Sequence, residues 1–427
     1  MVRVLWISAG HFFETGYGNM NRDILNYLQD QGFDVYSMSN QITVGMSRGY
    51  IIVEGIKTIP MGKDAFYRDI MPSVIQKVKP DLTFSLWDVW IWYDIRTKIN
   101  YWRMLKDQIG EDLVKWVPYV PIDAKLWKGS SIVKALEEAY HMVAMARFGY
   151  DELSKFFKKS DITLIPHHID TKVYYPKDYQ EAVEDLNNFL KEKGALIKPI
   201  EEALPEDSFK LIFVGENISE RKDIPRLLRA FKLFLDIVEQ NYKTNKDIKL
   251  ILRTNPEPVP GNSFDLISII EKLDISKNIV IFGEKMPAQY LNDLYNISDI
   301  YVSASRGEGF GLPIVEAMAT SKPAVLPGNS AHIEHVKDLQ TGKETKGWLV
   351  KCDNESEVLW TESLQDYPVI DPLDFAMKLY KAYVDWKENN GKEIKERGKN
   401  ALEYARSLDK EKILPKWKEL INTLLQG

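Results

Sequence analysis

The residues best suited to chemistry lie in one segment, 303–319, which reads SASRGEGFGLPIVEAMA. It follows an apolar run typical of a strand and leads into a helical pattern. Glycines at 307, 309 and 311 let the backbone approach a ligand closely, and Pro313 suits the first turn of a helix. The start of such a helix offers unpaired amides and the positive end of a dipole, so we predict a phosphate site at Gly311 and Leu312.

Two glutamates accompany this loop. Glu316 is expected in the first turn of the helix, where the dipole favours an ionised carboxylate, and Glu308 precedes the helix on the glycine loop. A carboxylate beside a phosphate would repel it, so both side chains are expected to accept hydrogen bonds from neutral hydroxyls. A glycine-rich turn with two solvated glutamates is the alternative, and the segment alone leaves it open.

Common nucleotide-binding fingerprints fit poorly. The first loop, from Gly16 to Asn21, reads GYGNMN and has asparagine where a dinucleotide-binding motif has its third glycine. Each Gly-Lys pair, at residues 62–63, 342–343 and 391–392, is followed by Asp or Glu where a P-loop needs Ser or Thr. These departures disfavour a dehydrogenase and an ATPase.

A metal site is also disfavoured. His332 and His335 could share one face of a helix, but no third ligand is apparent. Many sugar transferases hold a divalent ion on a diphosphate with two aspartates separated by a single residue. No such pair of aspartates occurs in this sequence. We therefore expect protein groups to neutralise any bound phosphate.

The elements that position these residues alternate between strand and helix. In the first half, short apolar runs predict strands at 2–8, 33–38, 82–86, 115–120, 142–146 and 162–165. A charged amphipathic stretch at 177–193 and a proline-bearing segment then interrupt the rhythm. Strands resume at 209–214, 248–252, 279–282, 300–304 and 323–326. This repetition predicts an α/β protein with two doubly wound, Rossmann-like lobes and a ligand cleft between them.

We accordingly divide the chain into an N-terminal lobe at 1–176, a charged helical linker at 177–208 and a C-terminal lobe at 209–400. Residues 401–427 are expected to form a helix that packs back toward the N-terminal lobe. Nucleic acid is an unlikely partner because the 427 residues carry a formal net charge of -6. The single cysteine, Cys352, excludes an intrachain disulfide, and no apolar run is long enough to span a membrane. A cytoplasmic protein is expected, and peripheral membrane contact stays open.

The glycine loop also carries a family resemblance. Glu308 and Glu316, eight residues apart around Gly-Phe-Gly-Leu-Pro, resemble the paired-glutamate signature of retaining glycosyltransferases with the GT-B fold, most closely family 4. Residues 165–170 with Pro176 are similar to the segment that closes the N-terminal lobe in that family. Residues 214–215 and 221–228 are similar to the first loop and helix of its nucleotide-binding lobe.

The resemblance implies transfer of a sugar from a nucleotide-diphosphate sugar, with retained anomeric configuration and without a required metal. It implies that Gly311 and Leu312 bind the distal phosphate, that Glu316 binds the ribose and that Glu308 binds the donor sugar. Arg221 and Lys222 would stabilise the departing diphosphate in place of a metal. The expected donor-binding residues are Gly16, Gly309, Phe310, Gly311, Leu312 and Glu316, and the expected catalytic residues are Glu308, Lys222, Arg221 and Asp123.

Two departures from the family pattern concern these roles. Many relatives have arginine after the Val-Gly that ends the first strand of the C-terminal lobe, where this chain has Glu216. Relatives often end an N-terminal strand in His-Asp, and here the corresponding residues are Ile122 and Asp123. Asp123 at the carboxyl end of a strand could orient an acceptor hydroxyl or simply cap a turn.

The acceptor itself stays open as a sugar, a lipid-linked group or a protein. The N-terminal aromatic residues could stack on an acceptor or form core; they are Trp87, Trp90, Trp92, Tyr93, Tyr101 and Trp102. A GT-B hydrolase or epimerase acting on a nucleotide sugar is the enzymatic alternative. A non-catalytic scaffold that binds sugar nucleotides is the alternative from another class.

Overall fold

The computed structural model describes residues 1–39, 49–194, 198–218, 220–258, 263–360 and 365–426. The chain forms two compact units, and neither is one continuous segment. Unit 1 comprises residues 1–168, 360–366 and 410–427, and unit 2 comprises residues 169–359 and 367–409. The first crossing between units follows His168, whereas the sequence places the end of the first lobe at 176.

Unit 1 is built on an eight-stranded sheet. All neighbouring strands pair in parallel except β3 with β4. The central strands are almost wholly buried, as expected for parallel strands that are covered on both faces. In spatial order the strands are β11 (Ile162–Leu164), β10 (Met142–Ala144), β8 (Trp116–Val120), β5 (Leu82–Leu86), β1 (Arg3–Ser8), β2 (Asp34–Ser39), β4 (Ile56–Ile59) and β3 (Ile51–Val53).

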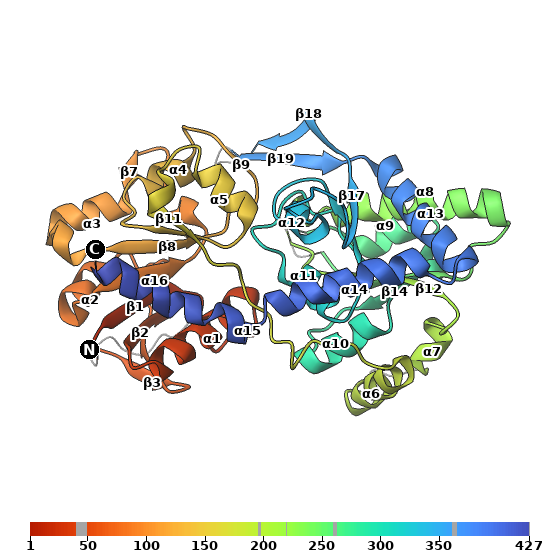
Figure 1. Cartoon of the computed structure of the whole chain (residues 1–427), viewed down its shortest axis with the longest axis horizontal. Helices are drawn as coiled ribbons and strands as arrows, with labels where there is room; N and C mark the ends of the chain where they lie inside the picture. Colours follow the sequence, from red (N-terminus) through yellow and green to blue (C-terminus); the bar gives the residue numbers. More distant parts are fainter. Residues whose placement is uncertain (40–48, 195–197, 219, 259–262, 361–364, 427) are drawn as a thin grey trace. The chain divides into compact units, whose positions relative to one another are not determined.

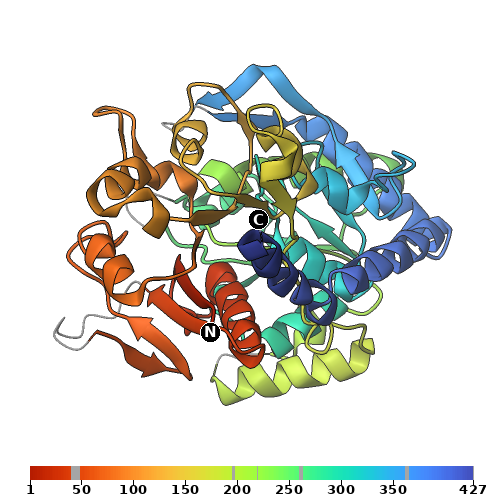
Figure 2. The same ribbon diagram turned by 60° about the vertical axis from the view of Figure 1, so that its left-hand side comes forward.

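The helices of unit 1 come from both ends of the chain. They are α1 (Gly16–Asp30), α2 (Met71–Val78), α3 (Tyr101–Ile109), α4 (Ser131–Leu136), α5 (Arg147–Leu153), α15 (Lys410–Ile413) and α16 (Pro415–Gln426). Helix α16 runs beside α1 (Figure 2). Its buried Trp417 contacts Trp6 of β1 and Phe84 of β5, with ring centroids 5.4 and 5.9 Å away. The C-terminal residues therefore complete the core of unit 1.

Unit 2 contains a six-stranded, fully parallel sheet. In spatial order its strands are β14 (Ile279–Phe282), β13 (Ile248–Arg253), β12 (Phe209–Val214), β15 (Ile300–Val302), β16 (Ala324–Pro327) and β17 (Gly347–Val350). Numbered along the chain, this order is 3-2-1-4-5-6, the doubly wound arrangement of dinucleotide-binding folds. Its direction reverses between β12 and β15, so the loops that follow these two strands lie at the topological switch point.

The helices of unit 2 pack on this sheet because their apolar residues recur at helical spacing. In α8 (Ile224–Tyr242), buried Leu227, Leu228, Phe231 and Phe234 form one face, and α13 (Pro372–Glu388) packs against α8 (Figure 1). Helix α11 (Leu312–Ala319) packs against α14 (Lys392–Ser407). The remaining helices are α6 (Tyr179–Glu192), α7 (Ile200–Ala203), α9 (Leu266–Lys272), α10 (Ala288–Asn296) and α12 (His332–Val336).

Smaller elements complete the description. Strand β18 (Cys352–Trp360) neighbours β19 (Gln365–Ile370), and Gln365 and Asp366 pair with the short β9 (Lys125–Leu126) within unit 1. The two-stranded hairpin of β6 (Tyr93–Asp94) and β7 (Ile99–Asn100) precedes α3. Within the described ranges, none of the helices combines the length and the apolar character that a bilayer-spanning helix needs.

Candidate functional site

The switch point of unit 2 brings together the loops after β12 and β15. The first loop leads through a short helical turn, η5 (Glu220–Lys222), into α8. The second is the glycine loop, which leads into α11. In open α/β sheets, ligands bind outside the carboxyl ends of the strands at such a reversal. The predicted residues Arg221, Lys222 and Glu308 therefore lie on the two loops that flank the expected ligand position.

Glu308 joins the two loops through a pair of cations. Its Oε1 lies 2.5 Å from Lys222 Nζ, and its Oε2 lies 3.0 Å from Arg221 Nη1. Only 9% of the residue is exposed. Burial alone would raise the pKa of this carboxyl, but Lys222 and Arg221 outweigh burial and hold the pKa well below its usual range. Glu308 is therefore ionised throughout the physiological range of pH.

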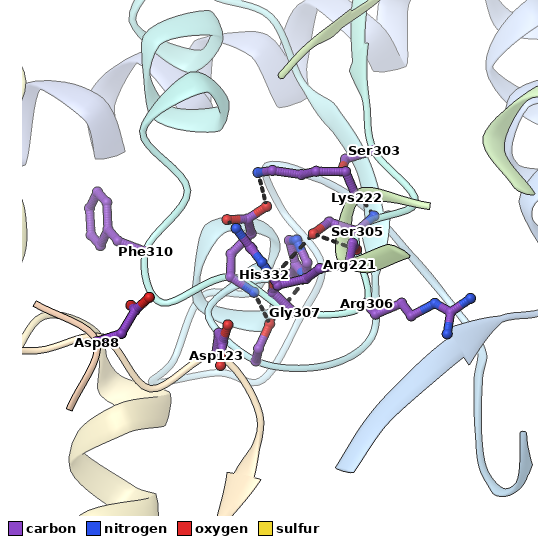
Figure 3. A network of polar contacts seen from close by, with 12 residues as sticks. Asp88, Asp123, Arg221, Lys222, Ser303, Ser305, Arg306, Gly307, Phe310 and His332 are labelled. Carbon is purple, nitrogen blue, oxygen red and sulfur yellow. Dashed lines mark hydrogen bonds and ion pairs between the residues drawn. The ribbon is translucent and has the colours of Figure 1, made fainter. Parts of the chain in front are cut away.

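Further hydrogen bonds fix the backbones of the two loops against each other. The Arg306 amide donates to the Arg221 carbonyl at 2.7 Å, and Arg221 Nη1 donates to the Gly307 carbonyl at 2.6 Å. Ser305 Oγ donates to the same Gly307 carbonyl at 3.0 Å (Figure 3). The Arg306 side chain points away from this network and pairs with Asp223 at 2.9 Å. Hydrogen bonds and ion pairs thus position both cations between the two loops.

The loop after β16 supports the glycine loop from another side. Ser330 Oγ accepts a hydrogen bond from the Glu308 amide at 3.1 Å, and Asn329 Nδ2 donates to the Arg306 carbonyl at 2.6 Å. His335 Nε2 donates to the Phe310 carbonyl at 2.6 Å. No sequence motif predicts this support, because the three residues follow β16 whereas the glycine loop follows β15.

His332 and His335 are buried and neutral. Burial lowers the pKa of His332 to about 3 and that of His335 to about 4. His335 uses both ring nitrogens, since Nδ1 lies 3.1 Å from the Tyr404 hydroxyl. His332 Nδ1 lies near Asn329, whereas its buried Nε2 has no hydrogen-bond partner among the described residues. Within the same residues, no group of three or more His, Cys, Asp or Glu side chains could hold a metal ion.

The start of α11 has the geometry of an anion site. Gly311 adopts φ 92° and ψ 61°, a left-handed conformation that favours glycine. A Cβ added there would lie 2.8 Å from Ile314 Cδ1. In the part of the chain that the structure describes, the amides of Gly311 and Leu312 donate to no protein acceptor. These amides and the helix dipole can therefore receive a negatively charged group.

Glu316 differs from its sequence-based prediction. Helix α11 begins at Leu312, so Glu316 is its fifth residue and lies in the second turn rather than the first. Burial raises the pKa of Glu316 to about 7, although hydrogen bonds with Tyr295 and Tyr174 oppose this rise. The Tyr295 hydroxyl donates to Oε2 at 2.8 Å. The expected stabilisation of the ionised form by the dipole is therefore wrong, because desolvation outweighs it.

The other predicted residues divide between the two units. In unit 2, the ring of Phe310 is buried against His335, with centroids 5.1 Å apart, so only its backbone can meet a ligand; Gly309 beside it is partly exposed. In unit 1, Gly16 is the first residue of α1 and Asp123 follows β8. Gln365 Nε2 donates to Asp123 Oδ1 at 3.2 Å. The structure thus clusters the C-terminal candidates and places Gly16 and Asp123 in the other unit.

Arg253 is a candidate that the sequence analysis missed. It ends β13, is 9% exposed, and its Nη1 lies 3.4 Å from Glu216 Oε1. Its buried Nε has no hydrogen-bond partner among the described residues, and its charge lowers the pKa of Glu316. Many relatives have an arginine at the position of Glu216, and here Arg253 of the neighbouring strand β13 places a guanidinium beside that position. The available signal was a charged residue at the carboxyl end of an apolar strand.

Two of the N-terminal aromatic residues are core. Trp102 stacks on Trp116 with centroids 4.5 Å apart, and Trp92 contacts Trp102 edge-on at 5.4 Å. Both Trp92 and Trp102 are fully buried, whereas Trp90 is exposed. An acceptor role for Trp92 and Trp102 is therefore wrong, because their ring faces are covered by one another and by β8.

Comparisons with known proteins agree with this architecture. Residues 196–360 match the family model described as glycosyl transferases group 1. A probable sucrose-phosphate synthase of Thermosipho melanesiensis is 26% identical over 211 residues, which are 48% of this chain and 43% of that protein. The chain thus spans less than half the length of that relative. Residues 196–360 are thus similar to group 1 glycosyl transferases.

Solved structures match over the whole chain. Sucrose-phosphate synthase from Thermosynechococcus elongatus aligns with a TM-score of 0.73 and 17% identity, covering 100% of both chains. Anabaena HepE in complex with UDP-glucose aligns with a TM-score of 0.64 and 12% identity, covering 99% of this chain and 100% of that chain. The protein therefore has the GT-B fold, with two Rossmann-like sheets.

Proposed function

We propose that this protein is a retaining, metal-independent glycosyltransferase of family 4 type that uses a nucleotide-diphosphate sugar as donor. The ion-paired group of Glu308, Arg221 and Lys222 at the switch point of unit 2 carries the proposal. The family match over residues 196–360 and the UDP-glucose complex of a protein with this fold support the choice of donor. The acceptor is a hydroxyl group.

In this proposal Lys222 and Arg221 act on the leaving group. Negative charge grows on the diphosphate as the bond to the sugar breaks, so cations fixed beforehand stabilise the transition state more than the ground state. Glu308 and the Gly307 carbonyl hold the two cations in place. The amides of Gly311 and Leu312 bind the distal phosphate, and no divalent ion is needed for charge balance.

Two other groups recognise the neutral parts of the donor. Glu308 accepts hydrogen bonds from the hydroxyls of the donor sugar, and Glu316 accepts them from the ribose. A desolvated carboxylate has few partners, so ligand hydroxyls stabilise the ionised form of Glu316. Arg253 ends β13, and its positive charge lowers the pKa of Glu316. We therefore propose that Arg253 contacts the nucleotide. We place the reaction in the cytoplasm, a location that suits a chain with one thiol.

The test has two stages. A thermal-shift screen with UDP, GDP, ADP and their glucose derivatives identifies the nucleotide, because a ligand that binds the folded state raises its stability by mass action. The bound donor is then incubated with a panel of sugar, lipid and peptide acceptors in EDTA. We expect a glycosylated product whose anomeric configuration, determined by NMR, matches that of the donor.

Other outcomes would contradict the proposal in distinct ways. Release of free sugar at the same rate with and without every acceptor would indicate a hydrolase. Conversion of the donor into an isomeric nucleotide sugar would indicate an epimerase. Binding without any turnover would indicate a scaffold. A product of inverted anomeric configuration would be consistent with a glycosyltransferase but would refute the retaining mechanism.

A further inference from the structure

His335 and Tyr404 form a hydrogen-bonded chain that ends on the glycine loop. His335 lies on α12 and is wholly buried, and Tyr404 lies on α14, a helix that contacts both α11 and α12. The Tyr404 hydroxyl lies 3.1 Å from His335 Nδ1, and His335 Nε2 lies 2.6 Å from the Phe310 carbonyl oxygen. Two helices are thus linked to the backbone of the loop that precedes α11.

The carbonyl at one end of this chain determines the direction of each hydrogen bond. A carbonyl oxygen only accepts, so His335 Nε2 must carry a hydrogen. Burial lowers the pKa of His335 to about 4, and the positive charge of Lys346 acts in the same direction, so the ring is neutral and carries only that one hydrogen. Nδ1 is therefore an acceptor, and the Tyr404 hydroxyl donates to it. Tyr404 thus stabilises the one neutral tautomer that can bond to the glycine loop.

Lys346 fixes the tyrosine end of the chain. This buried side chain places its Nζ 4.8 Å from the centroid of the Tyr404 ring, and the same Nζ donates to the Lys337 carbonyl at 2.5 Å. Lys337 directly follows α12. Because the face of an aromatic ring attracts a cation, Lys346 holds the Tyr404 ring against the end of the helix that carries His335.

The Phe310 carbonyl belongs to the same peptide unit as the Gly311 amide. This unit is trans and planar, so its C=O and N–H bonds point in opposite directions. With the oxygen bonded to His335, the Gly311 hydrogen points away from α12, and no protein acceptor meets it among the described residues. Glycine tolerates either sign of φ, so Gly311 itself does not prevent a rotation that would turn the carbonyl toward the anion site instead. The hydrogen bond from His335 opposes that rotation.

We propose that Tyr404 is a positioning residue for phosphate binding, which acts through the tautomer of His335 to keep the Gly311 amide facing the bound anion. The proposal rests on the proposed function, in which that amide binds the distal phosphate of the donor. It assigns a role in donor binding to α14, a helix that contributes none of the predicted site residues.

The tautomer is measured first, without any ligand. In protein labelled with ¹⁵N-histidine, the ring nitrogen shifts distinguish a nitrogen that carries hydrogen from one that does not, and His335→Gln identifies the His335 signals among those of the six histidines. We expect hydrogen on Nε2 in the wild type and a detectable population with hydrogen on Nδ1 in Tyr404→Phe. Tyr242→Phe is the matched control, since Tyr242 ends α8 and its hydroxyl donates to Glu388. The control should leave the tautomer unchanged.

Binding is measured next, by calorimetry with a nucleoside diphosphate and its monophosphate. The diphosphate is whichever of UDP, GDP and ADP raises the thermal stability of the wild type. Tyr404→Phe should weaken diphosphate binding by about three- to tenfold, as for loss of one hydrogen bond. Monophosphate binding should stay unchanged, because the monophosphate lacks the distal phosphate. A loop that is merely loosened would lose affinity for both ligands.

A second variant separates the tautomer from packing. The glutamine of His335→Gln always has an amide hydrogen for the Phe310 carbonyl and has no tautomers. Adding Tyr404→Phe to His335→Gln should therefore change diphosphate affinity by less than about twofold, whereas Tyr404→Phe alone is costly. His335→Phe, which removes the donor, should weaken diphosphate binding by about tenfold or more. Thermal unfolding verifies that each variant folds.

Several results would overturn the proposal. One is a wild-type His335 without hydrogen on Nε2, and another is an unchanged tautomer in Tyr404→Phe. Equal losses of diphosphate and monophosphate affinity, or the same loss in the His335→Gln background, would reduce Tyr404 to a packing role. Full diphosphate affinity in Tyr404→Phe would refute the positioning role alone. Wild-type protein that binds none of the three diphosphates would refute the proposed donor, and the positioning role with it.

Discussion

The pKa of Glu316 predicts how the stability of unit 2 depends on pH. A rise from 4.5 in the unfolded chain to about 7 in the folded protein corresponds to about 3 kcal/mol of unfolding free energy. Because the folded pKa is raised, this contribution is fully present below about pH 4.5 and is lost as pH rises through about 7. Glu316→Gln keeps the shape of the side chain and removes the titration. The variant should gain about 3 kcal/mol relative to the wild type between pH 4.5 and 8.

The assay must isolate unit 2, because a protein with two units need not unfold in a single transition. Urea unfolding at a series of pH values, with pulsed hydrogen exchange read on peptides from β15 and α11, reports the free energy of unit 2 alone. Glu396→Gln is the control, since Glu396 is an exposed residue of α14. Its profile should follow that of the wild type.

Ligand affinity provides a second measurement. Hydroxyls that donate to an ionised Glu316 favour its charged form, so affinity for the nucleoside diphosphate should rise as pH increases through about 7. In Glu316→Gln this dependence should disappear, and affinity should fall by about 1.5–3 kcal/mol above that pH, as for loss of hydrogen bonds to a charged group. If stability and affinity of the variant and wild type run parallel from pH 4.5 to 8, the desolvated carboxyl and its role with ribose are both refuted.

Three further predictions concern the same unit. Lys222→Ala should lower kcat by about 10²-fold or more with a smaller change in donor affinity, and Lys222→Arg should restore kcat only partly. If Lys222→Ala keeps full kcat at saturating donor, or if the remote control Lys246→Ala loses as much, the leaving-group role of Lys222 is refuted. Turnover should persist in EDTA, and activity that depends on added magnesium or manganese would contradict this. Gly311→Ala should destabilise unit 2 by about 1–3 kcal/mol in urea unfolding and weaken diphosphate binding. Gly342 also has a positive φ, 71°, but an added Cβ there has no neighbour within 4 Å. Gly342→Ala should therefore lose unfolding free energy through backbone strain alone and keep its affinity for diphosphate. Equal losses of diphosphate affinity in the two variants would count against the anion site.

The sequence predicted strands with continuous apolar runs better than short strands. The fully buried strands at 82–86 and 209–214 were predicted with the bounds that the structure has, because continuous apolar runs are typical of buried parallel strands. The edge strand at 279–282 was also predicted with its observed bounds. The antiparallel pair β3 and β4 and the edge strand β17 were not predicted. These strands are short, and their pairing depends on neighbours that are distant in sequence.

The site was predicted as separate residues and not as a network. Spacing and resemblance selected Arg221, Lys222 and Glu308, but no periodicity shows that a carboxylate would hold both cations. The sequence placed Glu316 one turn too early in α11, and it gave no sign of the burial that raises the pKa of this carboxyl. The roles of Arg253 and His335 were missed because each residue interacts with a loop that follows a different strand from its own. Such roles arise from the order of strands in the sheet.

The position of Trp417 sets an order for folding during synthesis. Its indole is wholly buried among Trp6, Phe84 and Tyr119, yet it lies ten residues from the end of the chain. A nascent chain that has finished the eight strands of unit 1 therefore still lacks one large piece of that core. Unit 2 receives its last residue, Asp409, before Trp417 is made. The core of unit 1 can therefore close completely only after every residue of unit 2 has been synthesised.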